Sequence, residues 1–197
     1  MADSKPDLRK RQFLVTTTSV ATGLATGAVA VPFVASMMPS ERAKAAGAPV
    51  EVDISTLEPG QRITVEWRGK PVWIVRRTPQ MLEAVRKDDE RVVDPASDRS
   101  EQPAYAKNEL RSIKPEYLVL VGICTHLGCV PVDRFEAKPE PFEANWHGGF
   151  YCPCHGSLFD FAGRVYKNKP APINLAVPPY KFLTNTKIVI GDDTRPA

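Results

Sequence analysis

The sequence predicts a mostly β domain preceded by one transmembrane α-helix. Three observations lead to this prediction. A segment near the N-terminus is free of charge, and short apolar runs with strand-like patterns follow it. The chain also contains 19 prolines and 12 glycines in 197 residues. Because proline and glycine end regular elements and form turns, this composition favours short strands joined by loops over long helices.

The charge-free segment, residues 12–38, exceeds the roughly 20 residues that a membrane-spanning helix needs. Lys10 and Arg11 precede it. By the positive-inside rule, this end stays in the cytoplasm and the rest of the chain is exported. The run from Lys10 to Leu14 resembles a twin-arginine export signal, which serves proteins that fold and receive a cofactor before export.

Residues 1–48 are therefore predicted to form a cytoplasmic tail, an anchor at about 13–38 and a flexible hinge rich in alanine. In an alternative interpretation, Ala43-Lys44-Ala45 is the cleavage site of a signal that is removed. The anchor interpretation is favoured because the charge-free run is long for a cleaved signal.

Residues 49–197 are predicted to form the exported domain. A helix is expected at 80–86, after the N-cap signal Thr78. Residues 87–114 are charged and contain proline, so they are predicted to be a surface excursion in which Asp88-Asp89-Glu90 forms a solvated turn. Strands are expected where apolar or β-branched residues alternate or run together, at 62–67, 72–75, 117–123, 149–151 and 187–190.

Two short motifs contain all four cysteines and two of the three histidines: CTHLGC at Cys124–Cys129 and CPCHGS at Cys152–Ser157. One cysteine and one histidine from each motif would make a four-ligand metal site. The set would be Cys124, His126, Cys152 and His155. Iron–sulfur centres in which two histidines replace two cysteines on one iron use this mixture. One cysteine per motif is then left over, and an exported pair would oxidise.

Two other interpretations remain open. Zinc also takes two cysteines and two histidines, although its ligands usually come as Cys–Cys and His–His pairs. Alternatively, the four cysteines could form two disulfides, in any of three pairings. That arrangement would leave His126 and His155 without a role.

The two motifs are similar to the cluster-binding boxes of Rieske iron–sulfur proteins of the cytochrome bc1 complex. Gly163-Arg164-Val165 and Lys169-Pro170-Ala171-Pro172 resemble that family's glycine turn and proline loop. The resemblance implies a Rieske-type antiparallel β-sandwich with a small cluster-binding subdomain at about 122–175. It also implies one Rieske-type [2Fe-2S] cluster as the cofactor.

Residue by residue, the resemblance implies that Cys124 and Cys152 ligate one iron and that His126 and His155 ligate the other. Ser157 would donate a hydrogen bond to a sulfide of the cluster. His155, with His126 beside it, would contact the quinol as the catalytic group.

The resemblance further implies a disulfide between Cys129 and Cys154. Leu127 resembles the residue that packs against the quinol pocket. Phe159 stands where the family often has a tyrosine that donates to a ligand sulfur. A missing donor predicts a reduction potential in the lower part of the family's range.

The implied function is that of a quinol–cytochrome c reductase subunit. It would accept an electron, coupled to a proton, from ubiquinol at cytochrome b and pass it to cytochrome c1, contributing to proton translocation. The expected setting is a dimeric complex of the bacterial inner membrane, with the domain on the periplasmic side. The alternatives are the Rieske subunit of an arsenite oxidase and the Rieske ring-hydroxylating oxygenases.

The charge distribution bears on a different class of partner. The net charge is only +3, and no long run of one sign occurs in the sequence. A dedicated nucleic-acid surface would require a clustered basic face, so nucleic acid is not an expected partner.

Overall fold

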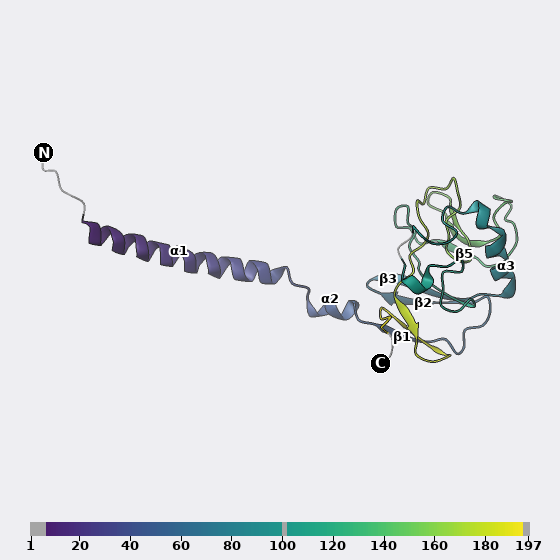
Figure 1. Ribbon diagram of the computed structural model, residues 1–197, viewed down its shortest axis with the longest axis horizontal. Coiled ribbons are helices and arrows are strands. Elements are labelled where there is room, and N and C mark those ends of the chain that lie inside the picture. The colour runs from purple at the N-terminus through teal and green to yellow at the C-terminus, as the bar shows by residue number, and fades with distance from the viewer. Residues whose placement is uncertain (1–6, 100–101, 195–197) are drawn as a thin grey trace. The chain divides into compact units, whose positions relative to one another are not determined.

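The computed structural model of the chain describes residues 7–99 and 102–194. The chain forms two compact units, Met1–Ala45 and Ala46–Ala197. The first is helical, and the second contains every described strand (Figure 1). The prediction of a mostly β domain after an N-terminal helix is confirmed.

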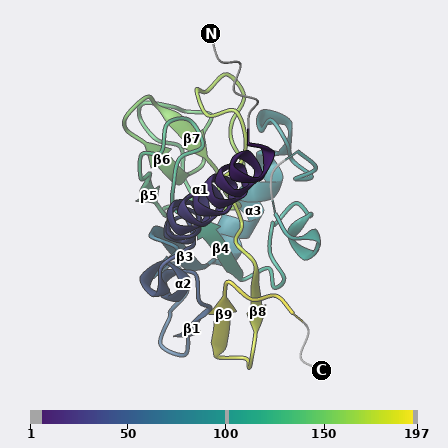
Figure 2. The ribbon, with the colours of Figure 1, turned by 90° about the vertical axis from the view of Figure 1, so that its left-hand side faces the viewer.

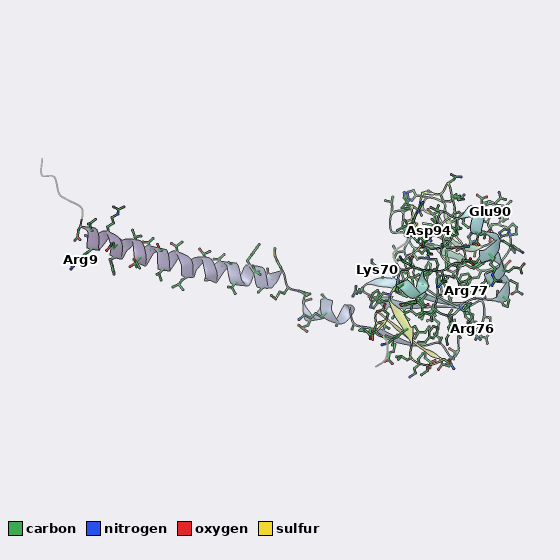
Figure 3. All side chains as sticks on the ribbon, viewed as in Figure 1. Arg9, Lys70, Arg76, Arg77, Glu90 and Asp94 are labelled. Carbon is green, nitrogen blue, oxygen red and sulfur yellow. A yellow bond between two sulfur atoms is a disulfide. The ribbon has the colours of Figure 1, made fainter. Side chains whose placement is uncertain are left out.

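The first unit is built around α1 (Leu8–Ser36). Asp7 caps this helix by accepting hydrogen bonds from the backbone N–H groups of Arg9 and Lys10, at 3.0 and 3.2 Å. No described residue of α1 is buried, and its side chains project on all sides (Figure 3). The helix is long and apolar enough to cross a membrane. An exposed apolar surface of this extent needs lipid or protein to cover it.

A second, short helix, α2 (Glu41–Ala46), lies in the predicted hinge and was not predicted. The Ser40 hydroxyl accepts from the Ala43 backbone N–H at 3.2 Å, as at a helix start. Lys44 and Glu41 form an ion pair at 2.7 Å. Alanine is the strongest helix former, so its abundance favours a helical turn here.

The second unit contains three antiparallel three-stranded sheets (Figure 2). Figure 2 shows the sheet that contains β8 and β9 at one end of the unit and the sheet that contains β6 and β7 at the other. The sheets are β1–β9–β8 (Val50–Asp53, Lys187–Ile190, Tyr180–Phe182), β2–β3–β4 (Arg62–Trp67, Lys70–Arg76, Tyr117–Val121) and β5–β6–β7 (Val132–Arg134, Gly149–Cys152, Ser157–Phe159).

The predicted hairpin in the central sheet is confirmed. β2 and β3 pair from Arg62 to Trp67, and their two-residue turn is Arg68-Gly69. Both turn residues have positive φ, 53° and 69°. That conformation matches the turns whose twist suits a two-residue hairpin.

The central sheet is joined to the β5–β6–β7 sheet by stacked aromatic rings. Trp73 of β3 stacks on Phe150 of β6, with ring centroids 5.1 Å apart and planes 17° apart. Gly122 lies directly against this indole, so any side chain there would collide with Trp73. Trp67 and Trp73 are both buried. The stack connects β3, which pairs with the strand that leads into the first cysteine motif, to β6, which leads into the second.

Among the described residues of the second unit, the longest helix is α3 (Pro79–Lys87). Thr78 caps it by accepting from the Met81 backbone N–H at 3.3 Å. Met81, Ala84 and Val85 are buried on one face of the helix. The helix prediction after Thr78 is confirmed.

The excursion after α3 contains two short 3-10 helices, η1 (Asp89–Arg91) and η2 (Ala104–Ala106). The prediction that it lies on the surface is wrong in part, because Arg111 is fully buried. Its guanidinium donates to carbonyl oxygens of Ala162, Gly163 and Leu175, at 3.1, 3.3 and 2.6 Å. These carbonyls lie in loops outside the sheet ladders, and a buried carbonyl needs a donor.

Arg77, which follows Arg76 at the end of β3 (Figure 3), also donates hydrogen bonds to backbone carbonyls of neighbouring segments. It donates to the carbonyl oxygens of Leu110 and Pro115 at 2.9 and 2.8 Å. Burial lowers the pKa of Arg77 to about 10, and burial lowers the pKa of Arg111 to about 10 as well. Both guanidinium groups therefore remain charged at neutral pH.

Candidate functional site

The two cysteine–histidine loops close with the same backbone turn. The Gly128 N–H donates to the Cys124 carbonyl at 3.0 Å, and the Gly156 N–H donates to the Cys152 carbonyl at 2.9 Å. Both glycines have positive φ, 85° and 77°. Glycine adopts this conformation at no steric cost, which explains its place in each motif. Each loop therefore begins at a buried cysteine and turns outward.

The regular strands deliver both cysteines to the interior. β4 ends three residues before Cys124, and β6 and β7 pair at Cys152 and Ser157. Cys124 is 2% exposed and Cys152 is 1% exposed. Burial raises the pKa of the Cys152 thiol, and the adjacent Cys124 thiol acts in the same direction. The structure thus brings together the two predicted sulfur ligands.

The two predicted imidazole ligands also meet. The rings of His126 and His155 have centroids 4.7 Å apart and stand at 89° to each other. His126 Nδ1 is buried and has no hydrogen-bond partner among the residues that the structure describes. A buried polar atom without a partner is costly, and a bound metal ion would satisfy it. His155 is exposed.

The remaining cysteines, Cys129 and Cys154, are joined by a disulfide, as the resemblance implied. The bond links the two loops across 25 residues of sequence. The Cys152 sulfur lies within 4.8 Å of both bridged sulfurs. Because sulfurs in a disulfide carry no free thiolate, this three-cysteine group is not itself a ligand set. The interpretation with two disulfides is excluded, because Cys124 and Cys152 are free.

A loop that includes residues 169–175 packs over the two motifs. The Ala171 N–H donates to Ser157 Oγ at 3.1 Å. The Thr125 hydroxyl donates to the Ile173 carbonyl at 2.6 Å. The Ser157 hydroxyl accepts in its contact, so its own proton remains available for another acceptor. The roles of Thr125 and Arg111 were not predicted from the sequence. A hydroxyl between two predicted ligands was the available signal for Thr125.

The outward surface of the site is apolar. Leu127, between the first histidine and its glycine, is 71% exposed. Val130 and Ile173 are 52% and 37% exposed. Isolated exposed apolar residues are ordinary, but several on the first cysteine–histidine loop and the neighbouring loop 169–175 indicate a contact surface. Phe159 is fully buried.

His147, the third histidine, is not part of this set. Its Nδ1 is 2.7 Å from Asp88 Oδ1. The Asp88 side chain is only 1% exposed, so the prediction of a solvated turn at this position is wrong. Arg91 Nη1 lies 3.5 Å from the same carboxylate oxygen. His147 and Arg91 thus flank one oxygen of this buried carboxylate.

The donors that the structure brings together suit a mixed-ligand iron–sulfur cluster. Two thiols and two imidazoles are the ligand set of the Rieske type. The unpartnered His126 Nδ1 and the paired, buried thiols of Cys124 and Cys152 fit such a group. The residues present therefore match the chemistry that the cluster requires.

Comparison with known protein families identifies two matching regions. Residues 1–40 match the family described as "Ubiquitinol-cytochrome C reductase Fe-S subunit TAT signal". Residues 96–180 match the Rieske [2Fe-2S] domain. The second region includes both cysteine–histidine loops.

Whole proteins of the same kind are similar along almost the entire chain. The ubiquinol-cytochrome c reductase iron-sulfur subunit of Allochromatium vinosum is 58% identical over 184 residues, covering 93% of this chain and 89% of that protein. The subunit of the same name from Bradyrhizobium diazoefficiens is 42% identical, with coverage of 96% and 98%. A solved chain from a structure titled "Hyperthermophilic respiratory Complex III" is 28% identical, covers 88% of this chain and 98% of its own length, and has a TM-score of 0.46. At the identity and coverage of the two whole-chain relatives, the chain belongs to the family of ubiquinol–cytochrome c reductase iron–sulfur subunits.

Proposed function

We propose that Cys124, Cys152, His126 and His155 hold a [2Fe-2S] cluster. The observation that carries this assignment is the convergence of two buried thiols with two imidazoles, one of which has an unpartnered Nδ1. Because His126 Nδ1 is buried, we assign it as the ligating atom, which leaves Nε2 directed outward. Ser157 offers its hydroxyl proton to a cluster sulfur, since its oxygen already accepts from Ala171.

The function that this site supports is electron transfer within a quinol–cytochrome c reductase. The chain is proposed to act between ubiquinol at a cytochrome b subunit and a cytochrome c1 subunit, contributing to proton translocation. When bound, a Rieske cluster accepts and returns one electron at a time, at a potential of roughly −150 to +300 mV against about −400 mV for plant-type all-cysteine clusters.

The residues of the chain supply the contact with the quinol. His155 is exposed, so its outward ring nitrogen can accept a hydrogen bond from the quinol hydroxyl and hold the proton. Leu127, which follows His126 in the first loop, presents an exposed apolar side chain and would exclude water from the contact. The loop that carries Ala171 and Ile173 shields the sulfur side of the site.

The proposed setting is the inner membrane of a bacterium. Residues 1–48 would provide the cytoplasmic tail, the anchor at about 13–38 and the hinge. Residues 49–197 would form the periplasmic domain, with the cluster-binding subdomain at about 122–175. The length and apolar surface of α1 support the anchor, and the match to an export signal supports the orientation. A dimeric complex is part of the same proposal.

Isolation of the complex through a tag on this chain tests the proposed function. We expect b- and c-type haems to copurify and the preparation to reduce cytochrome c with ubiquinol as donor. Copurification with a molybdenum cofactor and without haem b would instead support the arsenite oxidase alternative.

A matched pair of variants tests the contact assigned to Leu127. Leu127→Ala should retain the cluster spectrum and lower quinol turnover, because it removes apolar contact area. Leu183→Ala is the control, since Leu183 is 44% exposed and lies next to β8, in another sheet. Equal turnover in the two variants would contradict the assignment.

A further inference from the structure

A basic surface lies beside the second cysteine–histidine loop, and the site described above does not use it. Arg91, Lys167 and Lys169 line a hollow of about 440 Å³. We propose that this surface, here called the basic flank, docks an acidic protein partner, namely the carboxylate-bearing surface of the cytochrome that accepts the electron. The inference rests on the proposed function and adds the place and the charge of that contact.

The charges of the basic flank are only partly neutralised by neighbours. Lys167 Nζ donates to a neutral partner, the backbone carbonyl of Glu90, at 2.7 Å. Lys169 pairs with Glu143 at 2.9 Å, and both side chains remain partly exposed, at 24% and 29%. Glu143 lines the same hollow. Three cations therefore surround one acidic side chain at this surface.

Arg91 is the third cation of the flank, and contacts with two neighbouring residues hold its guanidinium in place. Its Nη1 donates to the Asn145 carbonyl at 2.9 Å and lies 3.5 Å from the buried Asp88 carboxylate. The Arg91 side chain is still 40% exposed. Of the side chains that line the hollow, three are cationic and one, Glu143, is acidic, so the lining itself is net positive.

An aromatic side chain adjoins the flank. Phe142 precedes Glu143 and is 53% exposed. Its ring packs against Tyr151 and Trp146, with centroids 5.0 and 5.8 Å apart, so it is supported on its inner side. Supported aromatic residues inside a charged rim are typical anchors of protein interfaces. The flank therefore resembles an interface with a protein more than a site for a small ion.

The flank is close to the proposed cluster ligands along two paths. The Phe142 ring packs against Tyr151, and Tyr151 directly precedes Cys152 in β6. Lys169 precedes Ala171 by two residues, and the Ala171 N–H contacts Ser157 Oγ at 3.1 Å. A partner seated on the flank would thus lie beside the loop that carries Cys152 and His155.

The quinol and the haem protein differ in charge, and this difference decides which of the two the basic flank would attract. A quinol is uncharged, so lysine and arginine side chains give it no electrostatic attraction. A haem protein with surface carboxylates gains attraction, faster encounter and a defined orientation from such a surface. Partly exposed ion pairs are weak, and weak contacts suit a partner that must be released after each transfer.

The experiment uses the intact complex with its cluster already reduced. A light flash on an added ruthenium photo-oxidant, with a sacrificial electron acceptor present to take up the electron, oxidises the c-type haem. The rate at which the haem is re-reduced is then followed at several ionic strengths. Lys169→Gln is compared with Lys181→Gln, a matched control. Lys181 pairs with Asp192 at 2.8 Å with exposures of 19% and 30%, close to the values of the Lys169–Glu143 pair.

We expect Lys169→Gln to slow re-reduction of the haem by about threefold at low salt. This is the effect of losing one partly exposed charge pair between the flank and a carboxylate of the partner. The difference should disappear at about 1 M salt, where the screening length is about 3 Å. Glu143→Gln should have the opposite effect and speed re-reduction, while Lys181→Gln and Asp192→Asn should match the wild type.

Three results would overturn the inference. Equal rates for Lys169→Gln and Lys181→Gln in an active complex would contradict the basic flank alone and leave the proposed function intact. An effect of Lys169→Gln that requires anionic lipid vesicles and is absent in neutral detergent would assign the flank to a lipid surface. A wild-type complex without any transfer from reduced cluster to haem would overturn the proposed function and this inference together.

Discussion

At the scale of single residues, two positions on β7 set the hydrogen bonds available to a bound cluster. Ser157 and Phe159 are two residues apart in the strand, so they point to the same face. Both are fully buried. Ser157 has a hydroxyl proton to offer, and Phe159 has none. A hydrogen bond to a cluster sulfur stabilises the added negative charge of the reduced state.

Phe159→Tyr is therefore expected to raise the reduction potential of the cluster. The new hydroxyl would add a donor on the face of β7 that already carries Ser157. A redox titration followed by EPR measures the change. Phe161→Tyr is the control, because Phe161 is also buried but packs in a separate cluster of core residues with Met81 and Val85. An unchanged or lower potential in Phe159→Tyr would contradict the account of the missing donor.

A second residue-scale prediction concerns the buried carboxylate of Asp88. Burial raises its pKa above the ordinary value of 3.8, against the lowering effect of the contact with His147. The folded state then holds the Asp88 proton more tightly than the unfolded state does. Its contribution to stability is present below pH 3.8 and is lost as pH rises through the folded pKa.

Asp88→Asn removes this titration. The stability of the wild type relative to the variant should fall as pH rises past 3.8 and then become constant. Urea unfolding of the holo-protein at several pH values measures the difference. A difference that rises with pH in this range would show that the ion pairs of Asp88 with Arg91 and His147 outweigh the cost of burial.

At the scale of elements, the two cysteine–histidine loops form one unit because a disulfide joins them. In the chain-entropy account, a bridge across 25 residues stabilises the folded state by roughly 3 kcal/mol. The hydrogen bonds from Ala171 to Ser157 and from Thr125 to Ile173 hold the covering loop to both motifs. The ligands therefore depend on three elements far apart in the sequence.

Cys129→Ser should loosen this unit and release the cluster more readily. We expect the bound iron to be lost at a lower temperature or lower denaturant concentration than in the wild type, as followed by the visible absorption of the cluster. Cys154→Ser should have the same effect, and the double variant should add little, because both single changes remove one bond. Full retention of iron in either single variant would contradict a clamping role.

The elements also show what the sequence could and could not predict. The β2–β3 hairpin and α3 follow from local signals, namely alternation, a two-residue turn and the Thr78 cap. The strands β5 and β7 have three residues each, too few for a visible period. The motifs indicated the types of ligand, since cysteine and histidine chemistry is local. The hydrogen bond from the Thr125 hydroxyl depends on the Ile173 carbonyl, 48 residues away, which a local sequence pattern cannot reveal.

Buried charges were the other feature that local pattern did not predict. Arg111 and Asp88 look like surface residues because their neighbours in sequence are polar. Arg111 is buried because its guanidinium donates hydrogen bonds to carbonyls 51 to 64 residues away. Asp88 is buried because His147, 59 residues away, pairs with it. Such partners are known only once the chain is folded.

At the scale of the whole molecule, the two units have different requirements for stability. The second unit has a core that includes Trp73, Phe150 and Leu118–Leu120 and that joins its sheets. The helix α1 buries none of its described residues within the chain, so its apolar surface is available for a bilayer. A tethered domain of this kind can reach two partners in turn, which is the arrangement that the proposed function requires.

The proposed function depends on the assignment of two histidines and two cysteines as ligands of a binuclear iron centre at the end of the two loops. Pulsed EPR of the reduced full-length protein, labelled with ¹⁵N only in histidine, tests it most directly. The account predicts one paramagnetic centre coupled to nitrogens of two different histidines, with the coupling lost in His126→Asn and in His155→Asn. A protein that contains zinc and gives no such signal, or a centre coupled to no histidine nitrogen, would contradict it.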